Sequence, residues 1–223
     1  EKLAVEKKEA WQEKVTSSVA KRSLIPYLKS RGVAKIDQLV LTDREPKQLD
    51  NLLEISKAFN LGEILVTEET LSKREFMDKL KESNLKVRPI KTGEQLFIFG
   101  SSLEVIENQN RASKASIAMY GKLLNQTFLV TGNIEEKFLN KSYPKIQADV
   151  VLTHQQASKK KTDVEVFKNL QPKTTVISVD KKKKFKEKNE ESNQELGNSI
   201  YKTDQKGAVR FKGWSSWRIE TVR

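Results

Sequence analysis

The sequence predicts an α/β fold with two mixed β-sheets faced by helices. Short buried strand patterns alternate with helical patterns over residues 38–81, and the spacing then changes to that of successive strands over residues 85–130. A strand-helix-strand pattern follows over residues 148–179. Strands joined by helices, together with an antiparallel meander, are typical of layers of sheet with helices packed outside them.

The first alternation contains two helix-strand units. The pattern over residues 23–30 predicts a helix that ends at Gly32, which provides a left-handed cap. A short buried strand is expected over residues 38–41. The apolar spacing over residues 49–59 predicts the next helix, and the Asn-Leu-Gly run at residues 60–62 is expected to end it.

The second unit begins with a buried strand over residues 63–66. Ser72 and Glu75 have the spacing of a capping box, which predicts a second helix over residues 76–84. Five strand patterns then form the expected meander, and glycines at 93, 100, 121 and 132 are expected to bound its strands. The patterns cover residues 86–88, 95–99, 103–106, 115–120 and 127–130.

The last third adds buried strands over residues 148–152 and 174–179, with a helix between them over residues 163–170. The stretch Thr203–Gly207 is expected to be the turn of a hairpin. Three closing strands are predicted over residues 199–201, 208–211 and 216–221. We expect Trp214 and Trp217 to pack against the sheet or an adjoining domain, although aromatic side chains of this kind can also stack on bases.

Composition limits the class of partner. The chain has 223 residues, 36% of them hydrophobic, which fits a globular fold, and it has no cysteine for disulfides or thiolate metal sites. No apolar run approaches the roughly 20 residues of a membrane span. The net charge is +12 and the pI about 9.6, which favours polyanions, either nucleic acid or an anionic membrane surface.

The stretch VLTDREPKQLDNL, residues 40–52, is the centre of the functional argument. A buried strand ends there, polar residues follow, and a helix pattern begins. In open α/β sheets, ligands are bound beyond the carboxyl ends of the strands. This stretch resembles the signature loop of the metallo-β-lactamase superfamily, T-H-x-[HD]-x-D-H-x-G-G-L, of which Thr42 and Leu52 are kept.

Other segments narrow the resemblance to ComEC-type competence proteins, the polytopic membrane proteins of bacterial DNA uptake. Five segments resemble that family's motifs, in the same order, from Ser23 onward. They are SLIPYLKSRGVAKIDQLVLT, FLVTGNIEEKFL, ADVVLTHQQASKKK, ISVDKKKKFKEKN and IYKTDQKGAVRFKG. The resemblance implies an αββα sandwich and a single C-terminal domain over residues 1–223, with a charged N-terminal segment over 1–22. The family's early motifs, DvGqGd and iDtG, do not occur, so we expect its first strands to be lacking.

The family's metal-ligand positions hold other residues in this chain. Asp50 and Asn51 also replace the two glycines of the signature loop, and the single histidine, His154, falls one place before the family's histidine pair. We expect His154 to be structural. The vestigial ligand positions are Asp43, Glu45, Lys47, Gln48, Asn133, Gln155, Gln156 and Glu187.

These replacements predict a domain without catalytic residues, metal or other cofactor. A two-metal hydrolase needs several imidazole and carboxylate donors that converge on cations a few Å apart. Lys47 places a positive charge where a cation would sit, and we expect it to form a salt bridge with Asp43 or Glu45. Clustered carboxylates without metals would repel one another, and Lys47 would relieve that repulsion.

Two lysine-rich segments follow predicted strands, and the resemblance implies that both loops border the groove of the family's active site. Together with Lys47 they predict a groove that binds DNA phosphates without sequence preference; solvated loops without function are the alternative. The lysines are Lys159, Lys160, Lys161, Lys181, Lys182, Lys183, Lys184, Lys186 and Lys188.

Three functions compete at this point. The first is a non-catalytic domain that binds or guides DNA, with the remainder of a membrane-embedded competence channel as its second partner and no small-molecule substrate. The second is an active metal-dependent nuclease that degrades one strand, and the third is a structural docking domain. The resemblance places the parent protein in the cell membrane and this domain on the extracellular face.

Overall fold

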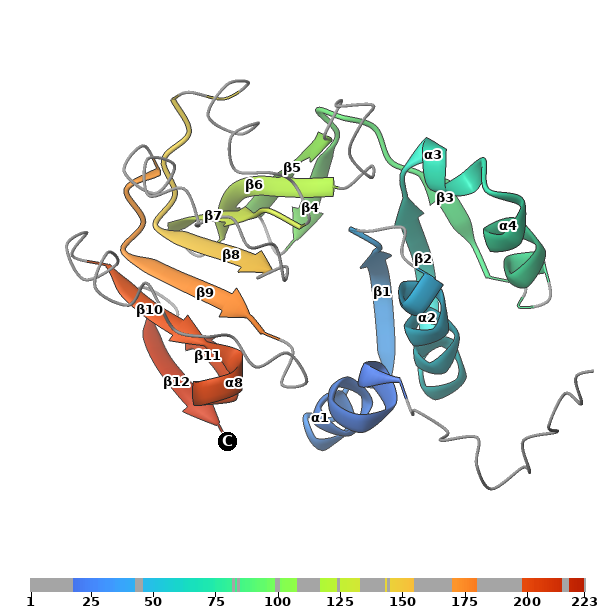
Figure 1. Cartoon of the computed structure of the whole chain (residues 1–223), viewed down its shortest axis with the longest axis horizontal. Helices are drawn as coiled ribbons and strands as arrows, with labels where there is room; N and C mark the ends of the chain where they lie inside the picture. The colour runs from blue at the N-terminus through green and yellow to red at the C-terminus, as the bar shows by residue number, and fades with distance from the viewer. Residues whose placement is uncertain are drawn as a thin grey trace, which may run out of the picture.

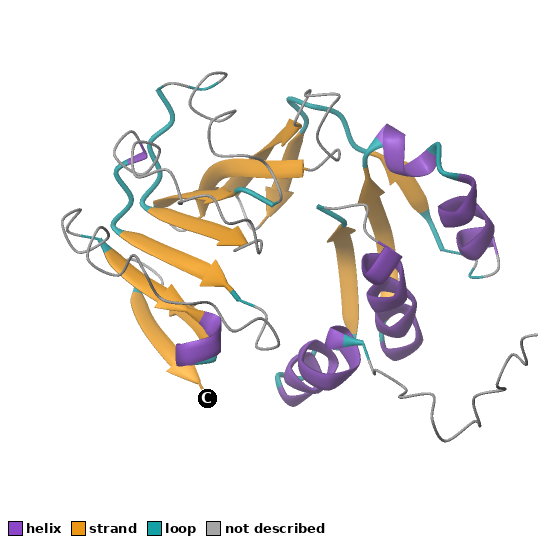
Figure 2. Ribbon diagram, viewed as in Figure 1, coloured by secondary structure: helices purple, strands orange, loops and turns teal. Residues whose placement is uncertain are grey.

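The computed structural model has two facing sheets, and its longer helices lie outside the three-stranded one (Figures 1 and 2). It describes residues 18–42, 46–81, 83, 85–98, 101–107, 117–123, 125–132, 143, 145–154, 170–179, 198–213 and 217–222. At residues 46–48, 98, 107 and 154 only the backbone is described. A three-stranded sheet lies on one side of the molecule and a seven-stranded sheet on the other.

The three-stranded sheet has the order β1-β2-β3, and its strands are parallel. Helices α2, α3 and α4 connect and cover it. The elements are β1 (Lys35–Val40), α2 (Pro46–Ala58), β2 (Asn60–Val66), α3 (Glu68–Leu71), α4 (Arg74–Lys81) and β3 (Val87–Pro89). The strand β2 is buried on both faces, which explains its continuous apolar run Ile64-Leu65-Val66.

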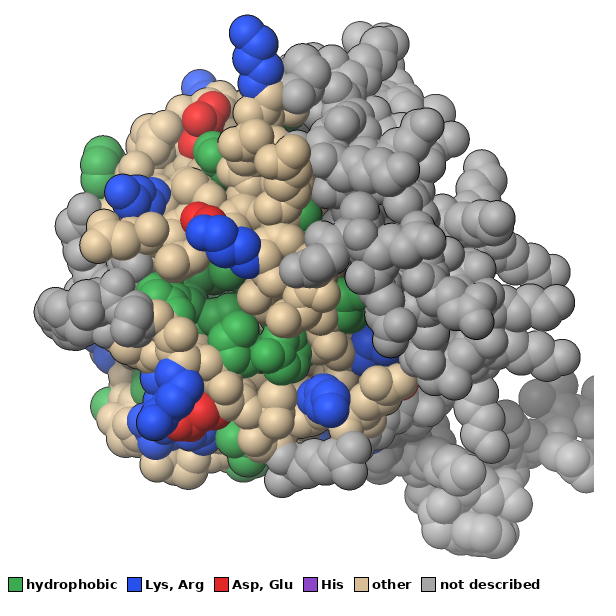
Figure 3. Space-filling model, turned by 90° about the vertical axis from the view of Figure 1, so that its left-hand side faces the viewer, with side chains coloured by type: hydrophobic (Ala, Val, Ile, Leu, Met, Phe, Trp, Pro, Cys, Tyr) green, Lys and Arg blue, Asp and Glu red, His purple; other side chains and the backbone are tan. Residues whose placement is uncertain are grey.

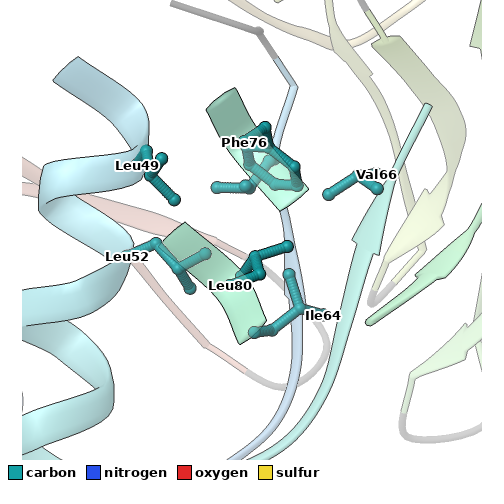
Figure 4. Close-up of a cluster of buried hydrophobic side chains, with 7 residues drawn as sticks. Leu49, Leu52, Ile64, Val66, Phe76 and Leu80 are labelled. Atoms are coloured by element: carbon teal, nitrogen blue, oxygen red, sulfur yellow. The ribbon is translucent and has the colours of Figure 1, made fainter. Parts of the chain in front are cut away.

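Alternate residues of β2 serve two cores, because successive side chains of a strand point to opposite faces. Ile64 and Val66 pack outward against the two longer helices, and Figure 4 shows them beside apolar side chains of α2 and α4. That outer cluster contains Leu41, Leu49, Leu52, Ile64, Val66, Phe76 and Leu80. Leu65 points the other way, toward the seven-stranded sheet, where it packs with Val105 and Ile117.

The chain begins its described part with a π-helix, η1 (Ala20–Leu24), which continues into α1 (Ile25–Ser30). Ala20 is buried and packs against Ile55 and Phe59 of the α2 region. The helix ends as predicted, since Gly32 has a φ of +72°. It starts earlier than the predicted residue 23.

The seven-stranded sheet is mixed, with the order β10-β9-β8-β7-β6-β5-β4. Strands β4 to β7 form an antiparallel meander, and β7 to β10 run parallel. The strands are β4 (Gln95–Ile98), β5 (Ser101–Glu107), β6 (Ile117–Leu123), β7 (Gln126–Val130), β8 (Val150–His154), β9 (Thr174–Ser178) and β10 (Ser199–Lys202). Its outer core contains Ile106, Ala118, Leu129, Val151 and Leu170.

A two-stranded hairpin of β11 (Ala208–Lys212) and β12 (Arg218–Val222) packs on β7. Three aromatic rings hold it there. The Trp217 ring centroid lies 4.8 Å from that of Phe128 on β7 and 5.1 Å from that of Phe211 on β11. The prediction that Trp217 packs in the structure is therefore confirmed, while Trp214 lies outside the described residues.

Several predicted boundaries and pairings were wrong. Strand β3 pairs in parallel with β2 and is not part of the meander. The helix α2 ends at Ala58, before Asn60 as predicted, but β2 begins at Asn60 and not at the predicted residue 63. The stretch Thr203–Gly207 is not a hairpin turn, because Thr203–Lys206 form the one-turn helix α8, which joins β10 to a different sheet.

Two helix and glycine signals were also misassigned. Ser72 is the C-cap of α3, and its hydroxyl donates to the carbonyl of Glu69, so it does not form the predicted capping box with Glu75. The helix signal that was missed is Thr67, whose hydroxyl accepts from the backbone N–H of Thr70. Gly121 lies inside β6 and does not bound a strand. A Cβ at this position would clash with the carbonyl oxygen of Ser102 on β5, so only glycine fits there.

Candidate nucleic-acid interface at the carboxyl edge of the strands

A backbone hydrogen bond just beyond the end of β1 joins this part of the chain to the seven-stranded sheet. Beyond β1, the N–H of Leu41 donates to the carbonyl of Leu65 at 2.9 Å, so the chain still follows β2. The carbonyl of Thr42 then accepts from the N–H of Ile117 at 3.0 Å. Since Ile117 opens β6, the loop that begins after Thr42 starts beside the larger sheet.

The same edge carries the carboxyl ends of the next three strands. Strand β6 runs antiparallel to β7, with Met119 opposite Val130, so β7 ends where β6 begins. The N–H of Thr131 donates to Leu152 of β8, and the Thr131 hydroxyl donates to the Thr153 hydroxyl at 3.1 Å. Strand β8 ends at His154, directly opposite Ser178 of β9.

Strand β10 completes this edge. The N–H of Val179, just beyond β9, donates to the hydroxyl of Thr203 at 2.9 Å, and Thr203 opens α8 directly after β10. Figure 1 shows the arrowheads of β8 and β9 and the end of β1 turned toward the middle of the molecule. Four separate loops therefore start at one edge, those after β1, β7, β8 and β9.

The sequence places the candidate site residues in these four loops. Asp43 and Glu45 follow β1, Asn133 follows Gly132, and Gln155 follows β8. All four lie outside the described residues. So do Gln156, Glu187 and the lysines at 159, 160, 161, 181, 182, 183, 184, 186 and 188. The structure thus places the starting points of the predicted site together and does not describe its side chains.

Lys47 and Gln48 are located by their backbone alone. They lie in the first turn of α2, which begins at Pro46 and has no acidic residue in that turn. The N-terminal end of a helix carries partial positive charge, which attracts anions, and Lys47 adds a full positive charge at the same end. The predicted salt bridge from Lys47 to Asp43 or Glu45 falls outside the described residues.

Asn51 has a role that sequence reasoning missed. Its side-chain oxygen accepts from the backbone N–H of Ala20 at 3.0 Å, across a sequence separation of 31 residues. The first N–H groups of a helix lack partners within the helix, so this bond satisfies one of them and ties η1 to α2. No local sequence pattern indicates this hydrogen bond between Asn51 and Ala20. Asp50, the other residue that replaces a glycine of the signature loop, is exposed.

Metal-ligating side chains do not gather in the described part of the chain, where no group of three or more His, Cys, Asp or Glu residues lies together. His154 closes β8, and its side chain is not described. The expectation that His154 is structural stays a prediction.

A second polar feature lies at the opposite edge, where β7 and β8 begin. The Asp149 carboxylate accepts from both the N–H and the hydroxyl of Thr127 at 2.8 Å, and it forms a 2.7 Å ion pair with Lys173. Burial raises the pKa of Asp149, but the hydrogen bonds from Lys173 and Thr127 outweigh it and lower this pKa from 3.8 to about 2. Sequence reasoning did not single out Asp149.

These residues line an open surface pocket of about 480 Å³, together with Tyr120, Lys145, Gln147, Ala148 and Gln171. Figure 3, which faces the left-hand side of Figure 1, shows acidic side chains lying beside Lys and Arg side chains, with hydrophobic side chains between them.

Comparison with known proteins supports the sequence resemblance. No family model matches the chain. The chain is similar to ComE operon protein 3 of Bacillus subtilis (strain 168), with 25% identity over 218 residues. The match covers 92% of this chain and 28% of that protein, so the chain spans little more than a quarter of its relative.

One solved structure shows the fold. The metallo-β-lactamase fold protein YhfI from Bacillus subtilis matches with a TM-score of 0.56 and 12% identity, over 83% of this chain and 81% of that one. A diphosphatase from the PhnP family matches with a TM-score of 0.46 and 12% identity, over 72% of this chain and 65% of that one. The predicted α/β fold of the metallo-β-lactamase type is confirmed, and so is the predicted similarity to a ComEC-type protein.

Proposed function

We propose that this chain, a relative of ComE operon protein 3 with the metallo-β-lactamase fold, is a non-catalytic domain of a membrane-embedded DNA-uptake protein. It binds DNA through lysine-rich loops. The supporting observation is the hydrogen bond from Ile117 to Thr42, which joins β1 to the larger sheet. With the order β6-β7-β8-β9, it brings the starts of four loops to one edge. Two of these loops and the first turn of α2 supply the ten predicted DNA-binding lysines.

The donor chemistry at the vestigial positions argues against hydrolysis. Of the eight positions, Asp43, Glu45 and Glu187 are acidic, one is Lys47, and the others are amides. Two metal ions need several charged or imidazole donors to lower the pKa of a bound water. A protonated lysine has no lone pair to offer a metal, so these residues do not fit a two-metal centre.

The charge distribution supports DNA as the partner. Lysine contacts to phosphate give affinity that depends on salt and not on sequence. The loop after β9 carries Lys181 to Lys184, Lys186 and Lys188, and the loop after β8 carries Lys159 to Lys161. The N-terminal end of α2, with Lys47 in its first turn, opens from the same edge. All these charges have the same sign as the overall net charge of +12.

A charge-removal experiment tests the proposal. One variant should weaken binding of both single- and double-stranded DNA. It combines Lys181→Gln, Lys182→Gln, Lys183→Gln and Lys184→Gln. The dependence of log K on log salt should become shallower by about one per lost phosphate contact or less.

The matched control removes four cations from the α4 region, with Lys73→Gln, Arg74→Gln, Lys79→Gln and Lys81→Gln. It changes the net charge equally but lies on the outer helical layer, so it should leave DNA affinity within about twofold. Equal affinity of the loop variant and the unmodified chain would refute the proposal, and so would an equal loss in both variants.

A nuclease assay tests the non-catalytic part. Purified chain is incubated with labelled DNA and Mn²⁺, Mg²⁺ or Zn²⁺, with EDTA as the control, and no cleavage is expected. Metal-dependent cleavage that is lost in an Asp43→Asn and Glu45→Gln variant would instead establish the nuclease alternative. Absence of both cleavage and DNA binding would favour the docking alternative.

The proposal places the parent protein in the cell membrane and this domain on the extracellular face. None of the described helices combines the length and apolar character that a membrane crossing requires. Attachment through other parts of a longer protein is consistent with the relative, of which this chain covers 28%.

A further inference from the structure

The first helical segment of the described chain carries charge of one sign. Residues 18–31, comprising η1, α1 and the residues that flank them, are called the basic helix below. It contains Lys21, Arg22, Lys29 and Arg31 and no acidic residue. All four side chains are exposed, and within the described part of the chain none of them forms an ion pair.

The basic helix also exposes apolar surface. Among the described residues, five large hydrophobic side chains are exposed, and three of them are here: Val19 at 61%, Leu24 at 40% and Tyr27 at 37%. Single exposed apolar residues are common on proteins, but three on one short helix with four cations are not expected from scatter alone.

The helix is held firmly against the body of the protein. Ala20 is 3% exposed and packs with Ile55 and Phe59, and Asn51 accepts from its N–H. On another side, the guanidinium of Arg210 on β11 lies 5.4 Å from the centroid of the Tyr27 ring, which adds a fifth cation beside the helix. Figure 1 shows α1 at the lower margin of the molecule, outside both sheets.

We propose that the basic helix docks the domain onto an anionic lipid surface, with its cations at the headgroups and Val19, Leu24 and Tyr27 at the boundary with the acyl chains. A cationic helix that also presents apolar and aromatic side chains is typical of interfacial binding. Nucleic acid would pair its phosphates with the cations and could stack a base on Tyr27, but it has no apolar surface to bury the exposed Val19 and Leu24. The lipid surface therefore explains more of the observed surface.

Helix α4 shows that this pattern is not general in the chain. Residues 73–81 also carry four cations, but Arg74 pairs with Asp78, Lys79 with Glu75, and Lys81 with Asp78. Its apolar side chains Phe76 and Leu80 are buried. Exposed apolar residues and unbalanced positive charge thus coincide on the basic helix and not on α4. This proposal does not depend on DNA binding by the lysine-rich loops.

The test measures co-sedimentation of the full 223-residue chain with vesicles of phosphatidylcholine alone or mixed with phosphatidylglycerol. Binding is expected only to the anionic vesicles. Each lysine or arginine near such a surface contributes about fivefold in affinity, so Lys21→Gln, Arg22→Gln, Lys29→Gln and Arg31→Gln together should reduce binding by roughly 600-fold. The four-cation control on residues 73–81 should retain binding to within about fivefold.

A second variant separates lipid from nucleic acid. Val19→Ser with Leu24→Ser keeps every charge and removes exposed side chains, so folding should be retained, and vesicle affinity should fall about tenfold while DNA affinity stays unchanged. No binding to anionic vesicles would overturn the proposal. So would binding that survives both variants of the basic helix, which would assign it to the lysine-rich loops, or a loss of DNA affinity in the serine variant.

Discussion

Asp149 provides the sharpest stability prediction, because its carboxylate joins three elements. It accepts two hydrogen bonds from Thr127 at the start of β7 and pairs with Lys173 just before β9, and its side chain is only 21% exposed. The pKa is lowered from 3.8 to about 2. At about 1.4 kcal/mol per pH unit, that shift contributes about 2 kcal/mol to the free energy of unfolding near neutral pH.

The sign of the pH dependence follows from the direction of this shift. A carboxyl whose pKa is lower in the folded chain stabilises it fully above the unfolded value, near 3.8, and this contribution is lost as the pH falls toward 2. Asp149→Asn removes the charge while keeping the shape. It should lower the free energy of unfolding by about 2 kcal/mol at pH 7 and change it little at pH 2.

Urea unfolding followed by circular dichroism at pH 7, 5, 4, 3 and 2 measures this difference. Asp37→Asn is the control, because that side chain is 80% exposed and its surface pair with Lys35 should contribute less than about 1 kcal/mol. The reasoning would be refuted if Asp149→Asn unfolded like the unmodified chain at pH 7. A deficit of the same size at pH 7 and pH 2 would refute it as well, since the cause would then not be the charge.

Two further predictions concern packing. Trp217→Ala removes the ring that lies between Phe128 and Phe211; it should cost about 2 to 3 kcal/mol in urea unfolding, whereas Trp217→Phe should recover most of the loss. Gly121→Ala forces a Cβ against the backbone carbonyl of Ser102 and should cost about 3 kcal/mol. Gly93→Ala, at φ +82° with no neighbour within 4 Å, should cost only about 1 kcal/mol.

Local patterns predicted the elements whose sequence spacing reports burial directly. Helix α2 buries Leu49, Leu52 and Ile55 at helical spacing, and the run Ile64-Leu65-Val66 is buried on both faces of its strand. Such patterns depend on contacts that every strand or helix of the kind must make. They were therefore readable without knowing which partners supply those contacts.

Pairing partners were less predictable, because short strands carry no information about which sheet they join. The three-residue strand β3 pairs with β2 and not with the meander that follows it. Gly121 resembles a strand boundary in sequence, yet it lies mid-strand. A glycine is needed there because the backbone of β5 approaches too closely for any side chain. The Asn51 bond to Ala20 links residues 31 apart, and no local spacing indicates it.

The sequence alone determined the α/β class, the order of most strands and the longer helices, and the fact that polar or lysine-rich segments follow β1, β7, β8 and β9. These properties are local to each segment. Only the tertiary structure decided that those segments start at one edge. The backbone bond from Ile117 to Thr42 and the parallel order of β7, β8 and β9 bring the four strand ends together. Such convergence depends on long-range pairing, in which each contact joins residues that are distant in the chain.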